Sequence, residues 1–262
     1  MTHLTAQLTA EDLRRLLDVS AEVHEITDEQ RQNLSHRFRS VPTLERRRLD
    51  AWSVEHSGSR DGTFAWGPST ARRVIATAAL RYGSNHDIHR AVQIAIDDQI
   101  DRARRGYARP GSLAHWMVNV PEPVIAIVAA EAVTWAVTTL ESLDLCGTGY
   151  RIAPSDNYYD VAGALTSLRG RRDAIIDQPD GRVVLRCRAG LPSRTAIAGL
   201  RSDLVVDALA HPQGQAAQRF IGIWPEAGIV LAVDGDATSL RLGARDLVRA
   251  AIVQRRRRLQ VA

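Results

Sequence analysis

Apolar residues recur at helical spacing through the first forty residues of the chain. In residues 8–19 leucines recur at positions that share one face of a helix, with Thr9 as a candidate N-cap. Residues 27–38 repeat the pattern, with Thr27 as the cap and Gln30 at the third helical position. The spacing predicts two amphipathic helices in this region.

A third short helix is predicted over residues 43–52, directly after Pro42. It contains Arg46, Arg47 and Arg48 in a row. A cluster of this kind is typical of a solvated helix face, and the alternative is contact with phosphate groups.

The central third of the chain also has helical periodicity. Residues 66–83 and residues 87–107 each predict one helix, and residues 111–145 predict a short helix followed by a long one that begins near Pro121 or Pro123. Alanine and valine surround the long segment, so we expect it to be buried on most sides.

Glu131 lies in the middle of that long apolar helix. A carboxylate in such surroundings needs a reason, which is either a partner arginine or a metal-binding or catalytic role. Because Glu131 interrupts the apolar run, we expect the run to be too short to cross a bilayer, and we expect no membrane partner.

The pattern changes after Gly147 to short alternating or β-branched runs bounded by Gly, Pro and Asp. Pro179-Asp180-Gly181 is a strong signal for a hairpin turn. Residues 231–240 also predict a turn between strands. The order is three strands, a helix, two strands and a helix, preceded by the long helix, which predicts a mixed α/β (α+β) fold with a sheet flanked by helices.

A polar, glycine-containing loop near residues 57–62 predicts a domain boundary. Residues 1–57 are then a helical N-terminal region, and residues 62–262 are the α/β core.

All 34 basic residues of the chain are arginines, and the net charge is +4. Without lysine, every basic contact comes from a guanidinium group, which keeps its charge and suits phosphate. Cys146 and Cys187 fit no metal-binding spacing, so we expect reduced, buried thiols in a cytoplasmic protein without a signal peptide. The charge permits nucleic-acid binding without requiring it.

One segment pair carries a resemblance to a known family. "GRRDAI", with Asp173, is followed by a turn and by "RCRAG", and the chain resembles the PD-(D/E)XK nucleases, particularly their RecB-like branch, over residues 64–254. The resemblance implies a restriction-endonuclease-like core, with Asp173 and Glu131 as ligands of Mg²⁺ or Mn²⁺.

Two positions depart from the pattern of that family. Arg186 stands where the second acidic ligand is expected, and Arg188 stands where the lysine is expected. An arginine at the first position places positive charge against the cation that the site should bind. The Q-x-x-x-Y segment of the RecB-like branch is absent, and "SDLVVDALA" occupies that helix.

The main hypothesis is therefore a nucleic-acid-binding protein, with DNA favoured over RNA, whose nuclease-like fold is no longer an enzyme and needs no cofactor. Five arginines are expected to line its groove and contact phosphate: Arg169, Arg171, Arg172, Arg186 and Arg188. Two alternatives stay open. One is an active Mg²⁺- or Mn²⁺-dependent nuclease in which Asp160 or Asp203 completes a site with Asp173 and Glu131. The other is a regulatory or scaffold protein that binds a protein partner through its N-terminal helices.

Overall fold

The structure is a computed structural model of the chain. It describes residues 16–17, 24–41, 46–57, 66–82, 87–144, 151–179, 181–188, 190–211 and 216–261. The chain divides into two compact units. The α/β unit comprises residues 1–62, 146–151 and 155–262, and the helical unit comprises residues 63–145 and 152–154.

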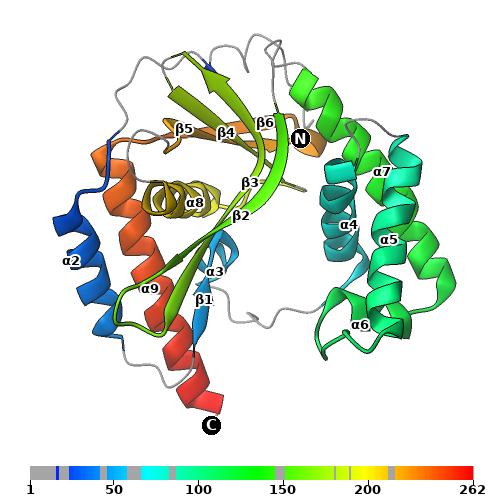
Figure 1. The fold of residues 1–262 in the computed structure, drawn as a ribbon, viewed down its shortest axis with the longest axis horizontal. Helices are drawn as coiled ribbons and strands as arrows, with labels where there is room; N and C mark the ends of the chain where they lie inside the picture. The colour runs from blue at the N-terminus through cyan, green and yellow to red at the C-terminus, as the bar shows by residue number, and fades with distance from the viewer. Residues whose placement is uncertain are drawn as a thin grey trace, which may run out of the picture. The chain divides into compact units, whose positions relative to one another are not determined.

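A mixed sheet forms the centre of the α/β unit (Figure 1). Its strands follow the order β1-β3-β4-β5-β6, and β2 also pairs with β3. β3 and β4 are antiparallel, β4 and β5 are parallel, and β5 and β6 are antiparallel. The strands span Arg47–Leu49 (β1), Arg151–Asp160 (β2), Thr166–Gln178 (β3), Gly181–Cys187 (β4), Arg219–Trp224 (β5) and Ile229–Asp234 (β6).

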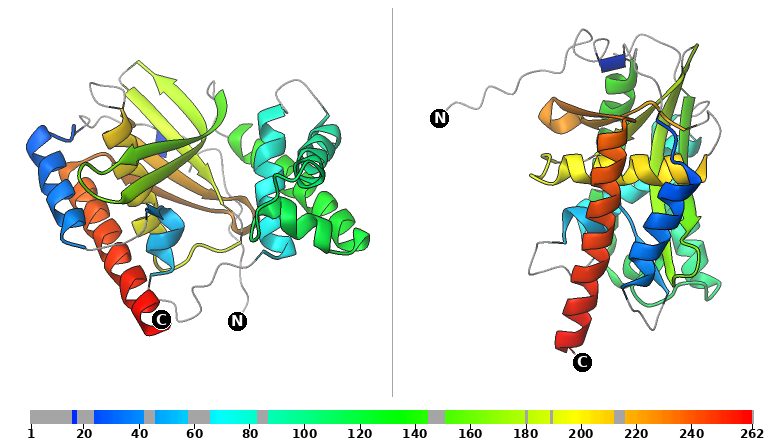
Figure 2. Two further views of the ribbon diagram at one scale, coloured as in Figure 1. Left: turned by 60° about the horizontal axis from the view of Figure 1, so that its bottom comes forward. Right: turned by 90° about the vertical axis from the view of Figure 1, so that its left-hand side faces the viewer.

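The helix α8 (Ala196–Ala210) packs against this sheet, and α9 (Ala237–Val261) packs against α8. The short α3 (Ala51–Glu55) contacts both helices, and α2 (Asp28–Arg39) lies beside α9 (Figures 1 and 2). The capping box predicted at Thr27 and Gln30 is present at the start of α2. A continuous apolar core joins these helices to the inner face of the sheet.

The predicted hairpin is confirmed between β3 and β4, where Gln178 pairs with Gly181 across the turn. Gly181 has a φ of +150°, a backbone conformation that favours glycine. The predicted order of strands and helices after residue 147 is also confirmed, and with it the α+β fold class. Local turn chemistry and alternation are strong in this half of the chain.

The helical unit contains α4 (Pro68–Tyr82), α5 (Ile88–Arg104), α6 (Leu113–Asn119) and α7 (Glu122–Asp144). α4 packs against both α5 and α7, and α5 packs against α6. The prediction that α7 is buried on most sides is wrong, because only 28% of its most apolar stretch, within residues 122–141, is buried. By length and composition α7 is also apolar enough to cross a membrane, contrary to expectation. A single helix of this kind is weak evidence for a membrane span, and the chain otherwise has the buried core of a soluble protein.

The domain boundary differs from the predicted one. The N-terminal segment is part of the α/β unit, because Leu34 and Phe38 of α2 are buried in its core. The separate body is the set of helices inserted before β2. One division between the units, at residues 62 and 63, does lie next to the predicted boundary, but the chain returns to the first unit after residue 145.

Two local predictions also need correction. Within residues 43–52, the described part forms β1 followed by Asp50 as the N-cap of α3, because β1 finds a parallel partner in β3. Asp236 is part of a helix start and not of a hairpin turn, since its carboxylate accepts the backbone N–H of Ser239 at 2.6 Å. The predicted helix at residues 8–19 lies mostly outside the described residues.

Gly243 of α9 sets the close crossing of α8 and α9. A Cβ at this position would lie 2.5 Å from the carbonyl oxygen of Arg201. Gly243→Ala is expected to lower the free energy of unfolding by about 1–2 kcal/mol, because the strain of overpacking exceeds the gain in helix propensity. Urea denaturation measures this change. Gly67→Ala is the control, since a Cβ at residue 67 meets no atom within 4 Å. If both variants lost the same free energy of unfolding, the close contact between α8 and α9 would not be the cause of the loss.

Candidate functional site

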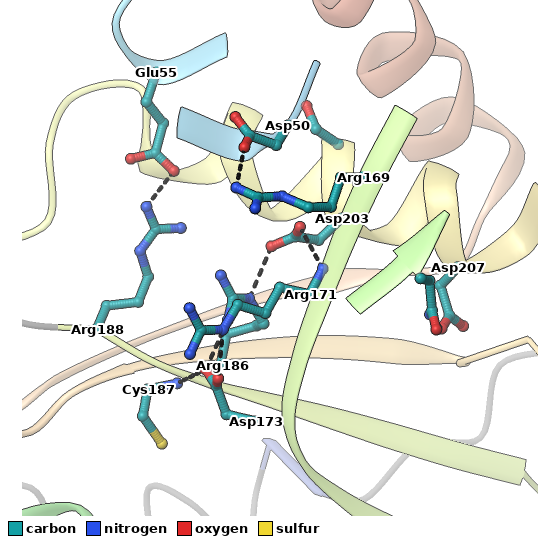
Figure 3. A network of polar contacts seen from close by, with 12 residues as sticks. Asp50, Glu55, Arg169, Arg171, Asp173, Arg186, Cys187, Arg188, Asp203 and Asp207 are labelled. Carbon is teal, nitrogen blue, oxygen red and sulfur yellow. Dashed lines mark hydrogen bonds and ion pairs between the residues drawn. The ribbon is translucent and has the colours of Figure 1, made fainter. Parts of the chain in front are cut away.

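Asp173, Arg186 and Asp203 form a buried ion-pair network at the centre of the α/β unit (Figure 3). The register that pairs Ala174 with Leu185 brings Asp173 of β3 beside Arg186 of β4. Arg186 donates from Nη1 to Asp173 Oδ2 at 2.7 Å and from Nε to Asp203 Oδ2 at 2.8 Å. One guanidinium group thus bridges two carboxylates from the sheet and from α8.

The remaining carboxylate oxygens of this network also have donors. Asp173 Oδ1 accepts from Arg171 Nε at 3.0 Å, and Asp173 Oδ2 also accepts the backbone N–H of Cys187 at 2.9 Å. Asp203 Oδ1 accepts the backbone N–H of Arg171 at 3.1 Å. All three central side chains are at least nine-tenths buried. Each buried charge therefore has an opposite charge and further hydrogen bonds, which a stable buried ion pair needs.

The two carboxylates of the network differ in electrostatics. Burial acts to raise the pKa of Asp173, but the charges of Arg186 and Arg171 and the N–H of Cys187 outweigh it, so the pKa is lowered. Burial raises the pKa of Asp203, and the charge of Arg186 offsets this only in part. The pKa of Arg186 is raised, because its burial is outweighed by the two carboxylates. The arginine therefore stays charged.

These residues do not fit the divalent metal that the nuclease resemblance implies. Arg186 lies between Asp173 and Asp203, so a guanidinium group already neutralises the two carboxylates that face each other there. Within the described part of the chain no group of three His, Cys, Asp or Glu side chains is placed to hold a metal ion.

Arg188 and Arg169 make further ion pairs on either side of this network. Arg188 donates to Glu55 at the end of α3 and lies over the ring of Trp224, with 5.6 Å from Cζ to the ring centroid. Burial raises the pKa of Glu55, and the charge of Arg188 opposes that shift. Arg169 donates to Asp50, the N-cap residue of α3. Two arginines of the sheet thereby fix the position of α3.

A second buried cluster surrounds Asp207, one helical turn after Asp203 on α8. Asp207 accepts from Asn157 Nδ2 at 2.9 Å and from the backbone N–H of Ala217 at 2.8 Å. Arg172 donates to Asn157 Oδ1 at 2.7 Å and lies 3.7 Å from Asp207. α8 is therefore joined by polar contacts to β2, to β3 and to the segment that precedes β5.

All five arginines predicted to line a phosphate-binding groove direct their guanidinium groups into contacts within the protein. The partners are Asp50 for Arg169, Asp173 for Arg171, Asn157 and Asp207 for Arg172, Asp173 and Asp203 for Arg186, and Glu55 for Arg188. Arg186 lies on β4 as predicted, whereas Arg188 follows the last residue of that strand. The guanidinium group of each pairs with a carboxylate from a helix.

The other candidate carboxylates are also paired. Glu131 of α7 lies in the helical unit, where it accepts from Arg72 Nη1 at 3.2 Å. This is the partner arginine that was one of the two explanations for Glu131. Asp160 is exposed and accepts from Arg46 at 2.7 Å. Cys187 is buried and free, as predicted, whereas Cys146 lies outside the described residues.

Sequence reasoning missed the roles of Asp207, Asp50 and Glu55. A signal for Asp207 exists, because "SDLVVDALA" carries two aspartates four residues apart in an otherwise apolar helix. Such a pair faces one side of the helix and must find partners in the core. For Glu55 and Asp50 no local signal exists, since their partners lie more than a hundred residues away.

Asp173→Asn is expected to lower the free energy of unfolding by about 2 kcal/mol at pH 7, because a charged hydrogen bond to Arg186 becomes neutral. The folded-state pKa of Asp173 lies below its ordinary value of 3.8, so its stabilising contribution is fully present above that pH and is lost as pH falls through the lowered pKa. Urea denaturation from pH 7 to pH 3 measures both effects. If the difference in free energy of unfolding between wild type and Asp173→Asn became smaller well above pH 4, the pKa of Asp173 would not be lowered in the folded protein.

No family model and no curated protein matches the chain. Among solved structures, one described as "Crystal structure of SSO0001" is similar over 69% of this chain and 85% of that chain, with 16% identity and a TM-score of 0.30. This likeness is too distant to bear on the chemistry of the site, which rests on the contacts described above.

Proposed function

We propose that this chain is a cytoplasmic DNA-binding protein with a nuclease-like fold whose catalytic metal site has been replaced by an internal ion-pair network. The observation that carries the proposal is the position of the Arg186 guanidinium between Asp173 and Asp203. A group of fixed positive charge at that point removes the reason for a divalent cation to bind.

The arrangement of elements supports the nuclease-like part of the proposal. Asp173 lies on β3 and the hairpin turn follows, then Arg186 lies on β4 and Arg188 directly after it, before α8. This is the order to which the sequence resemblance points. The strands are paired so that Asp173 and Arg186 are neighbours, as the acidic ligands of a working site would be. We infer that the scaffold persists while its chemistry has changed.

The basic character of the chain supports nucleic-acid binding, but through other arginines than the five that the sequence predicted. The arginines near the former site are committed to carboxylates, so phosphate contacts must come from exposed arginines elsewhere in the chain. A basic protein with only guanidinium cations is suited to such contacts.

A gel-shift assay with single- and double-stranded DNA, run at several salt concentrations with and without Mn²⁺, tests the proposal. The expected result is binding that weakens steeply with salt and no cleavage in any lane. Metal-dependent cleavage abolished by Asp173→Ala would instead favour the active nuclease with a relocated carboxylate. Absence of binding at low salt would reject DNA binding and leave a protein partner as the remaining class.

A further inference from the structure

Arginines form a line along the exposed side of α9. Arg241, Arg245, Arg249 and Arg256 are all exposed, and we call them the α9 arginine stripe. At 3.6 residues per turn the four positions fall within an arc of about 80°, and they extend over about 22 Å of the helix. The first three are spaced four residues apart, so their Cα atoms rise about 6 Å from one to the next.

The opposite side of α9 anchors the stripe. Leu240, Leu247, Ala250 and Ala251 are buried in the core of the α/β unit. The carbonyl of Ala251 also accepts from Arg47 Nη1 of β1 at 2.9 Å. Because α9 is fixed by these contacts, the orientation of the stripe is set by the fold and does not have to be ordered on binding.

The stripe arginines differ from those of the former metal site in their partners. Arg241, Arg249 and Arg256 make no salt bridge with any residue that the structure describes, and Arg245 has only its neighbour Asp246 at 3.6 Å. Arg37 of α2 adds another guanidinium near one end, since Arg37 and Arg241 line the same cleft of about 360 Å³. The guanidinium group of Arg186 therefore faces the core of the unit, whereas the stripe arginines are exposed.

We propose that the α9 arginine stripe binds the phosphate backbone of a nucleic-acid duplex. The inference rests on the proposed function and names the surface through which it acts. Guanidinium groups recognise phosphate through two parallel hydrogen bonds, and a row of them at regular spacing matches a polyanion whose charges are also regularly spaced.

Two other polyanions fit this surface less well. An amphipathic helix binds an anionic membrane by inserting its apolar face into the lipid. The apolar face of α9 is already buried in the core, so it is not free to insert. Single strands bind through aromatic side chains on which bases stack, and the sequence of α9 contains no aromatic residue. A rigid, linear and purely basic stripe favours the outside of a duplex.

The test compares two triple variants that remove the same charge. The first is Arg241→Gln, Arg245→Gln and Arg249→Gln. The matched control is Arg102→Gln, Arg104→Gln and Arg105→Gln at the end of α5, where Arg105 is the C-cap residue. These arginines are also exposed, and Arg102 and Arg104 have aspartate partners within the helix. Binding of a fluorescent 20-base-pair DNA duplex is measured from 50 to 300 mM salt, with circular dichroism to confirm that each variant is folded.

The stripe variant is expected to bind several hundredfold more weakly than wild type at about 0.1 M salt, with the slope of log K against log salt reduced by about 2.7. The control is expected to stay within about threefold of wild type. If both variants lost the same affinity for DNA, or if the stripe variant lost none, the α9 arginine stripe would not be the binding surface, although the protein would still bind DNA.

Two further outcomes have distinct meanings. A wild-type protein that binds no DNA would reject the proposed function itself and the stripe with it. Stripe-dependent binding to vesicles of anionic phospholipid, stronger than binding to the duplex, would overturn the choice of nucleic acid as the partner.

Discussion

Arg186→Ala is expected to lower the free energy of unfolding by about 3–5 kcal/mol, the range found when one partner of a buried ion pair is removed. The change deletes the guanidinium group that bridges Asp173 and Asp203, and it removes that positive charge from beside two buried carboxylates. Urea denaturation at pH 7 measures the loss.

The same variant tests whether the guanidinium takes the place of a cation. With Arg186 removed, Asp173 and Asp203 present oxygen atoms across a cavity, which is the kind of ligand that Mn²⁺ prefers. Millimolar Mn²⁺ is therefore expected to raise the melting temperature of Arg186→Ala and to leave that of the wild type unchanged. Stabilisation of the wild type to the same extent would mean that Mn²⁺ binds elsewhere.

Arg182→Ala provides the matched control for the loss of stability. Arg182 lies on the same strand and pairs with Asp177 at 2.9 Å, but the carboxylate is 55% exposed. Because exposed ion pairs contribute little, this variant is expected to lose less than about 1 kcal/mol and to show no response to Mn²⁺. A comparable loss in both variants would show that Arg186 is no more important than a surface arginine.

Much of the α/β unit could be predicted because its signals are local. The hairpin at Pro179 and Gly181 depends on turn chemistry within a few residues, and α8 depends on a single apolar run. The position of Asp173 beside Arg186 follows directly from that hairpin. Local rules therefore bring the acid and the arginine together, even though they do not say what the pair does.

The partners of the arginines could not be predicted, because they depend on contacts between distant parts of the chain. Arg188 and Glu55 are separated by 133 positions, and Arg169 and Asp50 by 119. An arginine facing a phosphate and an arginine facing a buried glutamate have the same local sequence pattern. The missing information is the packing of α3 against α8, which brings both acids over the sheet.

The prediction of the domain boundary was wrong for a related reason. The polar composition near residue 60 predicts a change of unit, but it does not reveal that the chain returns to the first unit near residue 146. The residues of α2 that enter the core, such as Leu34 and Phe38, look like the apolar face of any amphipathic helix. The residues that this face of α2 packs against belong to the sheet and to α9, which lie far along the sequence.

Asp207→Ala is expected to cost about as much as Arg186→Ala, about 3–5 kcal/mol, although Asp207 belongs to no motif. Asp207 is fully buried, and its removal takes away the carboxylate that lies 3.7 Å from Arg172, whose side chain is only 11% exposed. It also leaves the backbone N–H of Ala217 and the amide of Asn157 without their acceptor. Each loss adds a desolvation penalty that the truncated side chain cannot recover.

Hydrogen exchange separates this explanation from a simple cavity. In Asp207→Ala the Ala217 amide proton is expected to exchange at least tenfold faster than in the wild type, beyond the change that the loss of global stability accounts for. Asp207→Asn keeps an acceptor oxygen for that amide, so it should retain slow exchange at Ala217 and lose about 1–3 kcal/mol. Asp177→Ala, at an exposed carboxylate, should do neither. Unchanged protection of Ala217 in Asp207→Ala would mean that α8 does not hold the segment before β5, and that this network is a consequence of the packing rather than one of its causes.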